Sequence, residues 1–237
     1  MSEQPEGQVR KTFSQRLANG FFYALTSLLC RIEGSQISRV PPRGPLILVS
    51  NHVNVLEIPV LYARLWPRPI SGFFAAYRLD SPWMRWLLKT FGGIPVHRGE
   101  PDLRAIRQAI ARIRAGDIFA LAPEGTRSGD GRLGPGRPGV VMLALQTGAP
   151  ILPVVHYGDT GWLENLRRLR RTPFHIAVGR PFRLKAMNLQ LRRAERERMV
   201  DEIMYQMAAL LPPEYRGVYA DLSAATTRYL CFLEGPE

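Results

Sequence analysis

The chain has little cysteine, few acidic residues and no long apolar run. Its two cysteines, Cys30 and Cys231, lie near opposite ends of the 237 residues, and neither has a metal-ligand neighbour. A disulfide framework is therefore not expected, and a reducing, cytosolic setting is the simplest interpretation. No stretch reaches the roughly 18 apolar residues of a membrane-spanning helix. The apolar content of 46% excludes a disordered chain.

The shortage of acidic residues makes the chain strongly basic. There are 32 Lys and Arg against 20 Asp and Glu, which gives a net charge of +12 and a pI near 10.5. Such a surface attracts acidic partners, namely nucleic acid, an anionic membrane or phosphorylated substrates. Nucleic acid is disfavoured, because no recognised binding module is present and the arginine clusters lack interleaved aromatics for base stacking.

The N-terminal part combines basic and apolar residues. The apolar stretch GFFYALTSLLC (20–30) follows the mixed stretch VRKTFSQRLAN (9–19), and no small-residue cleavage site of a secretory signal comes after it. We predict an amphipathic helix over about residues 12–31 that lies in the membrane surface. A helix packed on the domain's own core is the alternative. We accordingly divide the chain into an interfacial segment, 1–34, and an α/β domain, 35–237.

Beyond that segment, strand-like and helix-like runs alternate. Continuous apolar runs such as PLILVSN (45–51) predict buried strands, and amphipathic runs such as PDLRAIRQAIARIRAG (101–116) predict helices. This alternation indicates a mostly parallel central sheet flanked by helices. The basic runs RRLRR (167–171) and RRAERER (192–198) are predicted to be solvated faces.

Chemically active residues follow several predicted strands. They are Asn51-His52, His97-Arg98, Glu124 to Arg127, and His156. In an open α/β sheet, ligands bind beyond the carboxyl ends of the strands, so these clusters are expected to meet there. Arg98 suits a phosphate, because a guanidinium binds it through a planar fork. A surface ion pair is the alternative for Arg98, and a structural salt bridge is the alternative for Glu124 and Arg127.

His52 and Glu57 resemble a general base with its orienting acid. A neutral imidazole removes a proton well when an acceptor holds its other nitrogen. Five residues of a helix turn through about 500°, so the two side chains meet only if His52 lies in the turn before the helix. The alternative is structural, since Asn54 as N-cap and Glu57 three residues later would form a capping box.

Four blocks together resemble the glycerolipid acyltransferases of the 1-acylglycerol-3-phosphate O-acyltransferase (lysophosphatidic acid acyltransferase) type. The blocks are NHVNVLE (51–57), GGIPVHRG (92–99), APEGTRS (122–128) and ILPVV (151–155). The resemblance covers about residues 35–185. It implies an acyltransferase that moves a fatty acyl group from acyl-CoA or acyl carrier protein to the hydroxyl of a lysophosphatidic-acid-like acceptor, without an acyl-enzyme.

The same resemblance implies roles for individual residues. His52 is the general base and Glu57 its carboxylate partner. The residues expected to bind substrate are Asn51, Arg78, Arg98, Glu124, Gly125, Thr126, Arg127 and Pro153. No metal and no cofactor are expected. The expected partners are the acyl donor, a lysophospholipid acceptor and an anionic membrane surface, which the chain would bind peripherally on the cytoplasmic face of the cell membrane.

Two positions depart from the family pattern. Glu57 stands where the family has aspartate, and the stretch AAYRL (75–79) has Ala76 and Arg78 where the family often has A-K-x-E-L. The acceptor's identity therefore stays open, and an amino-acid-derived lysolipid or a non-catalytic lipid-binding role are the alternatives. The acyl-chain length, the donor's carrier and the oligomeric state are not predicted.

Overall fold

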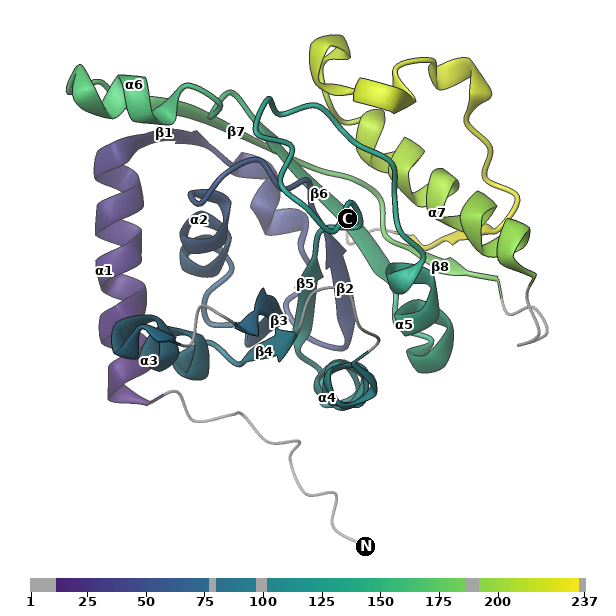
Figure 1. The fold of residues 1–237 in the computed structure, drawn as a ribbon, viewed down its shortest axis with the longest axis horizontal. Helices are drawn as coiled ribbons and strands as arrows, with labels where there is room; N and C mark the ends of the chain where they lie inside the picture. Colours follow the sequence, from purple (N-terminus) through teal and green to yellow (C-terminus); the bar gives the residue numbers. More distant parts are fainter. Residues whose placement is uncertain (1–11, 77–79, 97–101, 186–191, 235–237) are drawn as a thin grey trace, which may run out of the picture.

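The computed structural model describes residues 12–76, 80–96, 102–185 and 192–234. Nine strands form one sheet in this part of the chain (Figure 1). They are β1 (Cys30–Glu33), β2 (Leu46–Val49), β3 (Ile70–Ala75), β4 (Gly93–Val96), β5 (Ile118–Leu121), β6 (Ile151–Tyr157), β7 (Thr172–Val178), β8 (Phe182–Leu184) and β9 (Leu230–Phe232). The order is β1-β7-β6-β2-β5-β3-β4, with β8 pairing β6 and β9. The pairs β6–β7, β6–β8 and β8–β9 are antiparallel and the others are parallel, so the predicted fold class is confirmed.

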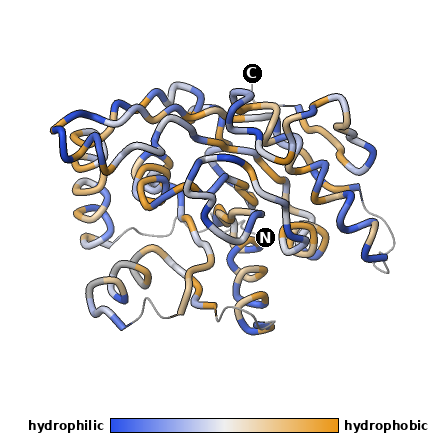
Figure 2. Tube along the Cα trace, turned by 45° about the horizontal axis from the view of Figure 1, so that its top comes forward, coloured by the Kyte–Doolittle hydropathy of each residue, from blue (hydrophilic) through white to orange (hydrophobic). Residues whose placement is uncertain are grey.

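Seven helices cover the two faces of the sheet within the same described residues. They are α1 (Phe13–Leu29), α2 (Glu57–Arg64), α3 (Pro82–Thr90), α4 (Leu103–Arg114), α5 (Gly139–Thr147), α6 (Trp162–Arg167) and α7 (Arg193–Ala208). Figure 1 shows α1 and α2 on one side of the central strands and α5 and α7 on the other. Hydrophobic residues concentrate in the middle of the molecule in Figure 2.

Strand β2 shows why the central strands read as continuous apolar runs. Leu46 and Leu48 belong to the hydrophobic cluster on the α2 side, whereas Ile47 and Val49 belong to the cluster that includes residues of α4, α5 and α7. All four side chains are at most 1% exposed. A parallel strand with helices on both faces has no polar side, so apolar residues occupy every position.

The N-terminal helix is joined to the sheet. Helix α1 starts with a capping box between Thr12 and Gln15, packs on α2, and leads directly into β1, which pairs with β7. Strand β1 therefore lies within the segment 1–34 that the sequence assigns to the interface. Within the described residues, no helix is both long and apolar enough to cross a bilayer.

The two basic runs differ in the structure. The run 192–198 forms the first turns of α7, and its arginines are exposed as predicted. The run 167–171 includes the end of α6, a helix that the sequence analysis did not predict. In that run Arg171 hydrogen-bonds the carbonyl oxygens of Ser27 and Cys30, where α1 ends. Arg171 is exposed, as predicted for the whole run, and it also joins α6 to the end of α1.

Candidate active site

The carboxyl ends of three neighbouring strands bring the predicted clusters together. Asn51 and His52 follow β2, Glu124 follows β5, and His156 lies near the end of β6. Strand β2 is hydrogen-bonded to both β5 and β6, so these side chains meet although they are 72 to 105 positions apart. This is the edge at which parallel sheets commonly bind ligands.

His52 and Glu57 are in contact. The Nδ1 atom of His52 is hydrogen-bonded to Oε1 of Glu57. His52 lies in the turn before α2, which is the arrangement that the spacing requires. The His52 side chain is 26% exposed and the Glu57 side chain 5%. A buried carboxylate therefore holds one ring nitrogen, while a partly exposed ring is left to face a substrate with the other.

The backbone of His52 is also held by a neighbouring loop. Its N–H donates to Oε1 of Glu124 at 3.3 Å, and its carbonyl accepts from the N–H of Ser128 at 2.8 Å. These two bonds attach the turn after β2 to the loop after β5. The backbone of His52 is thus fixed at both its N–H and its carbonyl group, which limits where the imidazole can lie.

The predicted capping box at α2 is wrong in detail. Helix α2 begins at Glu57, with Leu56 and not Asn54 as its N-cap. The Asn54 N–H does donate to Oε2 of Glu57 at 3.2 Å, but the Asn54 side chain accepts from the N–H of Leu56 and donates to Asp159. Glu57 consequently has both of the predicted contacts: Oε1 binds the His52 ring and Oε2 accepts from the Asn54 N–H.

His156 and Asn51 tie the ends of β2 and β6 together. The Asn51 side-chain amide donates to the His156 carbonyl at 2.8 Å and accepts from the His156 N–H at 2.9 Å. Both polar ends of the Asn51 side chain are therefore engaged with a neighbouring strand. Asn51, which the family resemblance assigns to substrate binding, is 2% exposed and joins two strand ends.

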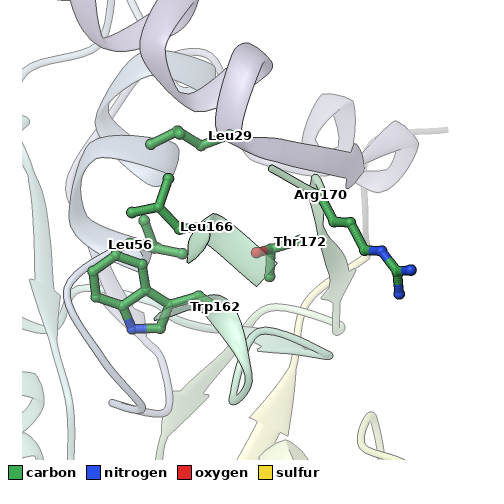
Figure 3. A pocket seen from close by; sticks show the side chains of 6 residues that line it. All are labelled: Leu29, Leu56, Trp162, Leu166, Arg170 and Thr172. Carbon is green, nitrogen blue, oxygen red and sulfur yellow. The ribbon is translucent and has the colours of Figure 1, made fainter. Parts of the chain in front are cut away.

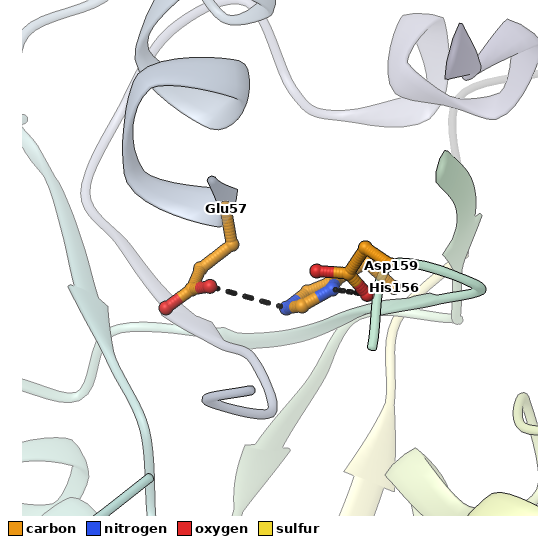
Figure 4. A group of neighbouring side chains, drawn as sticks. All are labelled: Glu57, His156 and Asp159. Atoms are coloured by element: carbon orange, nitrogen blue, oxygen red, sulfur yellow. Dashed lines mark hydrogen bonds and ion pairs between the residues drawn. The ribbon is translucent and has the colours of Figure 1, made fainter. Parts of the chain in front are cut away.

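A buried charge network continues beyond Glu57. His156 Nδ1 lies 3.2 Å from Oδ1 of Asp159, and His156 Nε2 lies 4.0 Å from Oε2 of Glu57. Figure 4 shows Glu57 on one side of the imidazole and Asp159 on the other. Asp159 is 0% exposed and also accepts from the Asn54 side chain at 2.6 Å. His52, Glu57, His156 and Asp159 thus form a continuous row.

Three members of this row, Glu57, His156 and Asp159, are residue types that can bind a metal ion. Ligand atoms of Glu57, His156 and Asp159 lie within 4.8 Å of one another. Each ring nitrogen of His156, however, already faces an oxygen, because Nε2 lies 3.2 Å from the carbonyl oxygen of Asn51. A metal ligand needs a free ring lone pair directed at the ion, so this geometry fits a hydrogen-bonded network and not a cation site.

Glu124 anchors the loop that follows β5. Its Oε2 accepts from the Gly134 N–H at 2.9 Å, and its carbonyl accepts from the Arg137 side chain at 3.1 Å. Burial raises the pKa of Glu124 above its ordinary value, although the hydrogen bonds from Gly134 and His52 offset part of this effect. Gly125 has a φ of +70°, and a Cβ there would lie 2.9 Å from the Arg137 Cδ, so a larger residue would displace that arginine.

An open groove runs beside this loop. Its volume is about 590 Å³. Half of the residues that line it are polar or charged, namely Glu124, Thr126, Ser128, Asp130, Arg132 and Arg137, and the others are Leu133, Pro135, Val218 and three glycines. Thr126 and Arg127, two of the predicted substrate-binding residues, are exposed in this loop. Glu124, whose carboxylate accepts from the His52 N–H, is one of the residues that line the groove.

An apolar wall lies on the other side, where α1, α2 and α6 meet. Leu29, Leu56, Trp162 and Leu166 surround a small void with Arg170 and Thr172 at its edge (Figure 3). Its volume of about 10 Å³ is no larger than one water molecule, so α6 packs closely on the other two helices. Apolar side chains thus pack together where α1, α2 and α6 meet, whereas the groove beside the loop after β5 has charged side chains in its lining.

The remaining predicted residues lie apart or outside. Pro153 is buried in β6, in register with Val49 of β2 and three residues before His156. Arg78 and Arg98, the predicted phosphate ligands, lie outside the described residues. Ala76 is described and is partly buried after β3. The sequence analysis flagged His156 only as a strand end, and it missed Asp159, which the spacing of three residues in HYGD could have suggested.

Comparison with known proteins agrees with this geometry. A family model described as acyltransferase matches residues 31–157, which is more than half of the 237 residues. The chain belongs to the acyltransferase family. A crystal structure of the 1-acyl-sn-glycerophosphate acyltransferase PlsC from Thermotoga maritima superposes with a TM-score of 0.61 at 24% identity, covering 83% of this chain and 78% of that one. It supports the acyltransferase fold.

Curated relatives are similar over part of their length. A probable 1-acyl-sn-glycerol-3-phosphate acyltransferase of Mycoplasma genitalium is 30% identical over 62% of this chain and 59% of its own. A 1-acyl-sn-glycerol-3-phosphate acyltransferase of Limnanthes alba is 30% identical over 68% and 57%. A lyso-ornithine lipid O-acyltransferase of Pseudomonas aeruginosa is 29% identical over 57% of each chain. The chain thus spans somewhat more than half the length of these relatives of the acyltransferase family.

Proposed function

We propose that this acyltransferase moves a fatty acyl group from a coenzyme A or carrier-protein thioester to the hydroxyl of a lysophosphatidic-acid-like acceptor. The observation that carries the proposal is the hydrogen bond between His52 Nδ1 and the buried Glu57 carboxylate, at the carboxyl end of β2. Relatives named as 1-acyl-sn-glycerol-3-phosphate acyltransferases support this acceptor class.

The proposed chemistry needs one base and no covalent enzyme intermediate. Glu57 accepts the Nδ1–H of His52, which leaves the Nε2 lone pair to take the proton of the acceptor hydroxyl. The oxygen attacks the thioester carbonyl carbon. The tetrahedral intermediate then expels the thiolate, which takes the proton back from His52 and leaves as the free thiol. The new ester oxygen replaces the broken carbon–sulfur bond, and the base returns to its neutral form.

The polar groove and the apolar wall suit the two ends of such a substrate. Arg132 and Arg137, beside Thr126 and Ser128, supply cations and hydroxyls for an anionic headgroup. Leu166 of α6 is 42% exposed on the α1 side, and an acyl chain would pack on such exposed apolar surface and not in the void of about 10 Å³ beside it. The proposal therefore assigns the headgroup to the groove and the chain to the α1 side.

A second acceptor class is an amino-acid-derived lysolipid. The similarity to a lyso-ornithine lipid O-acyltransferase and the departures at Glu57 and Ala76 favour it. An ornithine headgroup carries no phosphate, so it would need fewer arginines than lysophosphatidic acid.

An acceptor screen tests both proposals. The purified chain is given radiolabelled acyl-CoA or acyl carrier protein with either lysophosphatidic acid or lyso-ornithine lipid, and lipid products and released thiol are measured. Phosphatidic acid is the expected product. Product from lyso-ornithine lipid alone would replace the first acceptor by the second. Thioester that stays intact with both acceptors would contradict the enzymatic proposal and favour a lipid-binding protein.

We also propose that the chain binds an anionic membrane surface through α1, peripherally and on the cytoplasmic face. Four apolar side chains of α1 are exposed by 54% to 81%, namely Phe13, Leu17, Phe21 and Leu28. At about 100° per residue they fall within roughly 80° of one another on the helix, whereas the buried Thr26 faces the opposite side. An exposed apolar stripe of this kind is typical of interfacial helices.

The end of α6 extends this apolar surface. Arg171 hydrogen-bonds the end of α1. Just before it, Leu163 and Leu166 of α6 and Leu169 after the helix are exposed by 52%, 42% and 94%. Leu169 has a φ of +52°, at the left-handed position after a helix where glycine is usual. Arg167 and Arg170 are exposed beside it. Apolar tips with flanking arginines suit a bilayer that contains anionic lipid.

The triple change Phe13→Ser, Leu17→Ser and Phe21→Ser is expected to lower vesicle binding at least tenfold. Partial burial of these side chains contributes more than about 1.4 kcal/mol, which corresponds to that factor. Substitution is preferable to deletion of residues 1–33, because β1 belongs to the sheet. Sedimentation with vesicles of phosphatidylcholine and phosphatidylglycerol measures the effect.

A matched control is Leu103→Ser. Leu103 is 62% exposed on α4, which packs on the other face of the sheet. Vesicle binding by the Leu103→Ser variant should stay within twofold of that of the unchanged protein. Equal binding by the triple variant and the unchanged protein would exclude α1 as the contact.

A further inference from the structure

His156 is enclosed by hydrogen-bond acceptors. Its ring is 1% exposed, with Nδ1 at 3.2 Å from the Asp159 carboxylate and Nε2 at 3.2 Å from the Asn51 carbonyl oxygen. A neutral imidazole has a single N–H, so in either tautomer one lone pair would point at an oxygen lone pair. A protonated ring donates from both nitrogens and satisfies both contacts.

We propose that His156 is a permanent buried imidazolium that acts as a positioning residue for acyl transfer, by holding Glu57 as an anion and thereby setting the basicity of His52. The proposal deepens the proposed function and rests on it. His156 does not touch the reacting atoms, because Glu57 lies between the two imidazoles: Glu57 Oε1 binds His52 and Glu57 Oε2 lies 4.0 Å from His156.

The charges around His156 support this protonation state. The groups that face it are Asp159 in the loop after β6, Glu57 on α2, and Glu124 and His52 at the ends of β5 and β2. On the remaining side Phe174 of β7 stacks on the ring, with centroids 5.0 Å apart. Burial disfavours the charged ring, but the hydrogen bond and charge of Asp159, the charge of Glu57 and the Asn51 carbonyl outweigh burial and raise the pKa of His156.

The cation matters because two carboxylates lie in one buried row. With His156 protonated and His52 neutral, the row of His52, Glu57, His156 and Asp159 has a net charge of −1. Without the cation, Glu57 and Asp159 would place −2 in a site where both are nearly inaccessible to water. Two buried negative charges would favour protonation of a neighbouring group, and His52 is the imidazole that remains to accept the proton.

The sign of the effect on His52 follows directly. Removing a neighbouring positive charge stabilises the protonated form of His52 and raises its pKa. A general base must be unprotonated, so the acid limb of the pH profile of kcat/KM moves to higher pH. A side chain that only fills space would lower activity equally at every pH and leave that limb in place.

The experiment compares the unchanged protein with His156→Gln and with the control His175→Gln. His175 also pairs with a carboxylate, Glu33, but on the neighbouring strand β7 and at a partly exposed position. In His156→Gln, both the acid limb and the His52 pKa measured by NMR titration should rise by about 1 unit. In His175→Gln both should stay unchanged. Unshifted values in His156→Gln, with activity lowered at all pH values, would overturn the positioning role.

Nitrogen NMR of the unchanged protein tests the protonation state without any substituted variant. The chain has four histidines, so assignment of labelled imidazole signals is practical. Both His156 nitrogens should carry protons at pH 7.5, and a signal typical of a neutral ring would overturn the proposal. Because neither NMR readout needs a substrate, inactivity towards every acceptor would contradict the proposed function while these readouts still decide the state of His156.

Discussion

Replacing His52 by alanine is expected to lower the turnover number by about 10³-fold while the protein stays folded. General-base catalysis by a positioned imidazole contributes about 10² to 10⁴ in rate. Among the described residues, His52 alone combines a hydrogen bond to Glu57 at one ring nitrogen with a partly exposed ring. The cost in stability should be small, because the His52 side chain is 26% exposed and the loop contacts use its backbone. Thiol release from acyl-CoA in the presence of acceptor measures the loss.

The control for His52→Ala is His175→Ala. That residue also pairs with a carboxylate and is 28% exposed, but it lies on β7 beside Glu33. Its turnover should remain within twofold of the unchanged protein, and circular dichroism should show both variants folded. Unchanged turnover in His52→Ala would remove His52 from the mechanism.

Replacing Glu202 by alanine is expected to lower the free energy of unfolding by about 4 kcal/mol. Glu202 on α7 is 2% exposed, and its carboxylate accepts from the Thr226 hydroxyl at 2.6 Å and from the N–H groups of Arg228 and Tyr229 at 2.8 Å. Alanine leaves the buried N–H of Tyr229 without an acceptor, which costs about 1–3 kcal/mol, and it removes the hydrogen bonds of the exposed Thr226 and Arg228, at about 0.5–1.5 kcal/mol for each. Urea unfolding, followed by the midpoint and slope, measures the change.

Two further variants make the Glu202 result specific. Glu197→Ala removes an exposed carboxylate from the same helix, where it pairs with Arg193, and should change stability by less than about 0.5 kcal/mol. Glu202→Gln keeps one acceptor oxygen and should fall between the two. Similar losses in Glu202→Ala and Glu197→Ala would show that the bonds to residues 226–229 do not stabilise the fold.

The arrangement of the site follows from its two flanks. The turn after β2 is bound on one side to the loop 122–137 through Glu124 and on the other to the end of β6 through Asn51. The first flank leads to the polar groove and the second to α6 and the apolar wall.

Sequence reasoning succeeded where neighbouring residues determine the outcome. The apolar run 45–51 forms β2, and the helix predicted over about 12–31 is α1 followed by β1. His52 meets Glu57 because both lie within one short turn. The assignment of Asn54 as the helix N-cap failed because Asp159, 105 residues away, holds its side chain. A distant partner competes with a local motif, and local spacing cannot show it.

Composition and order were enough to indicate a mostly parallel sheet, its functional edge and the dyad of His52 and Glu57, because hydrophobic periodicity and short spacings act over a few residues. Other contacts depend on which strands are neighbours. They are the buried row that continues to His156 and Asp159, the hydrogen bonds between Asn51 and β6, and the contact of Arg171 with α1. Strand order arises from the packing of the whole chain, so contacts that span 100 or more residues appear only when the sheet is assembled.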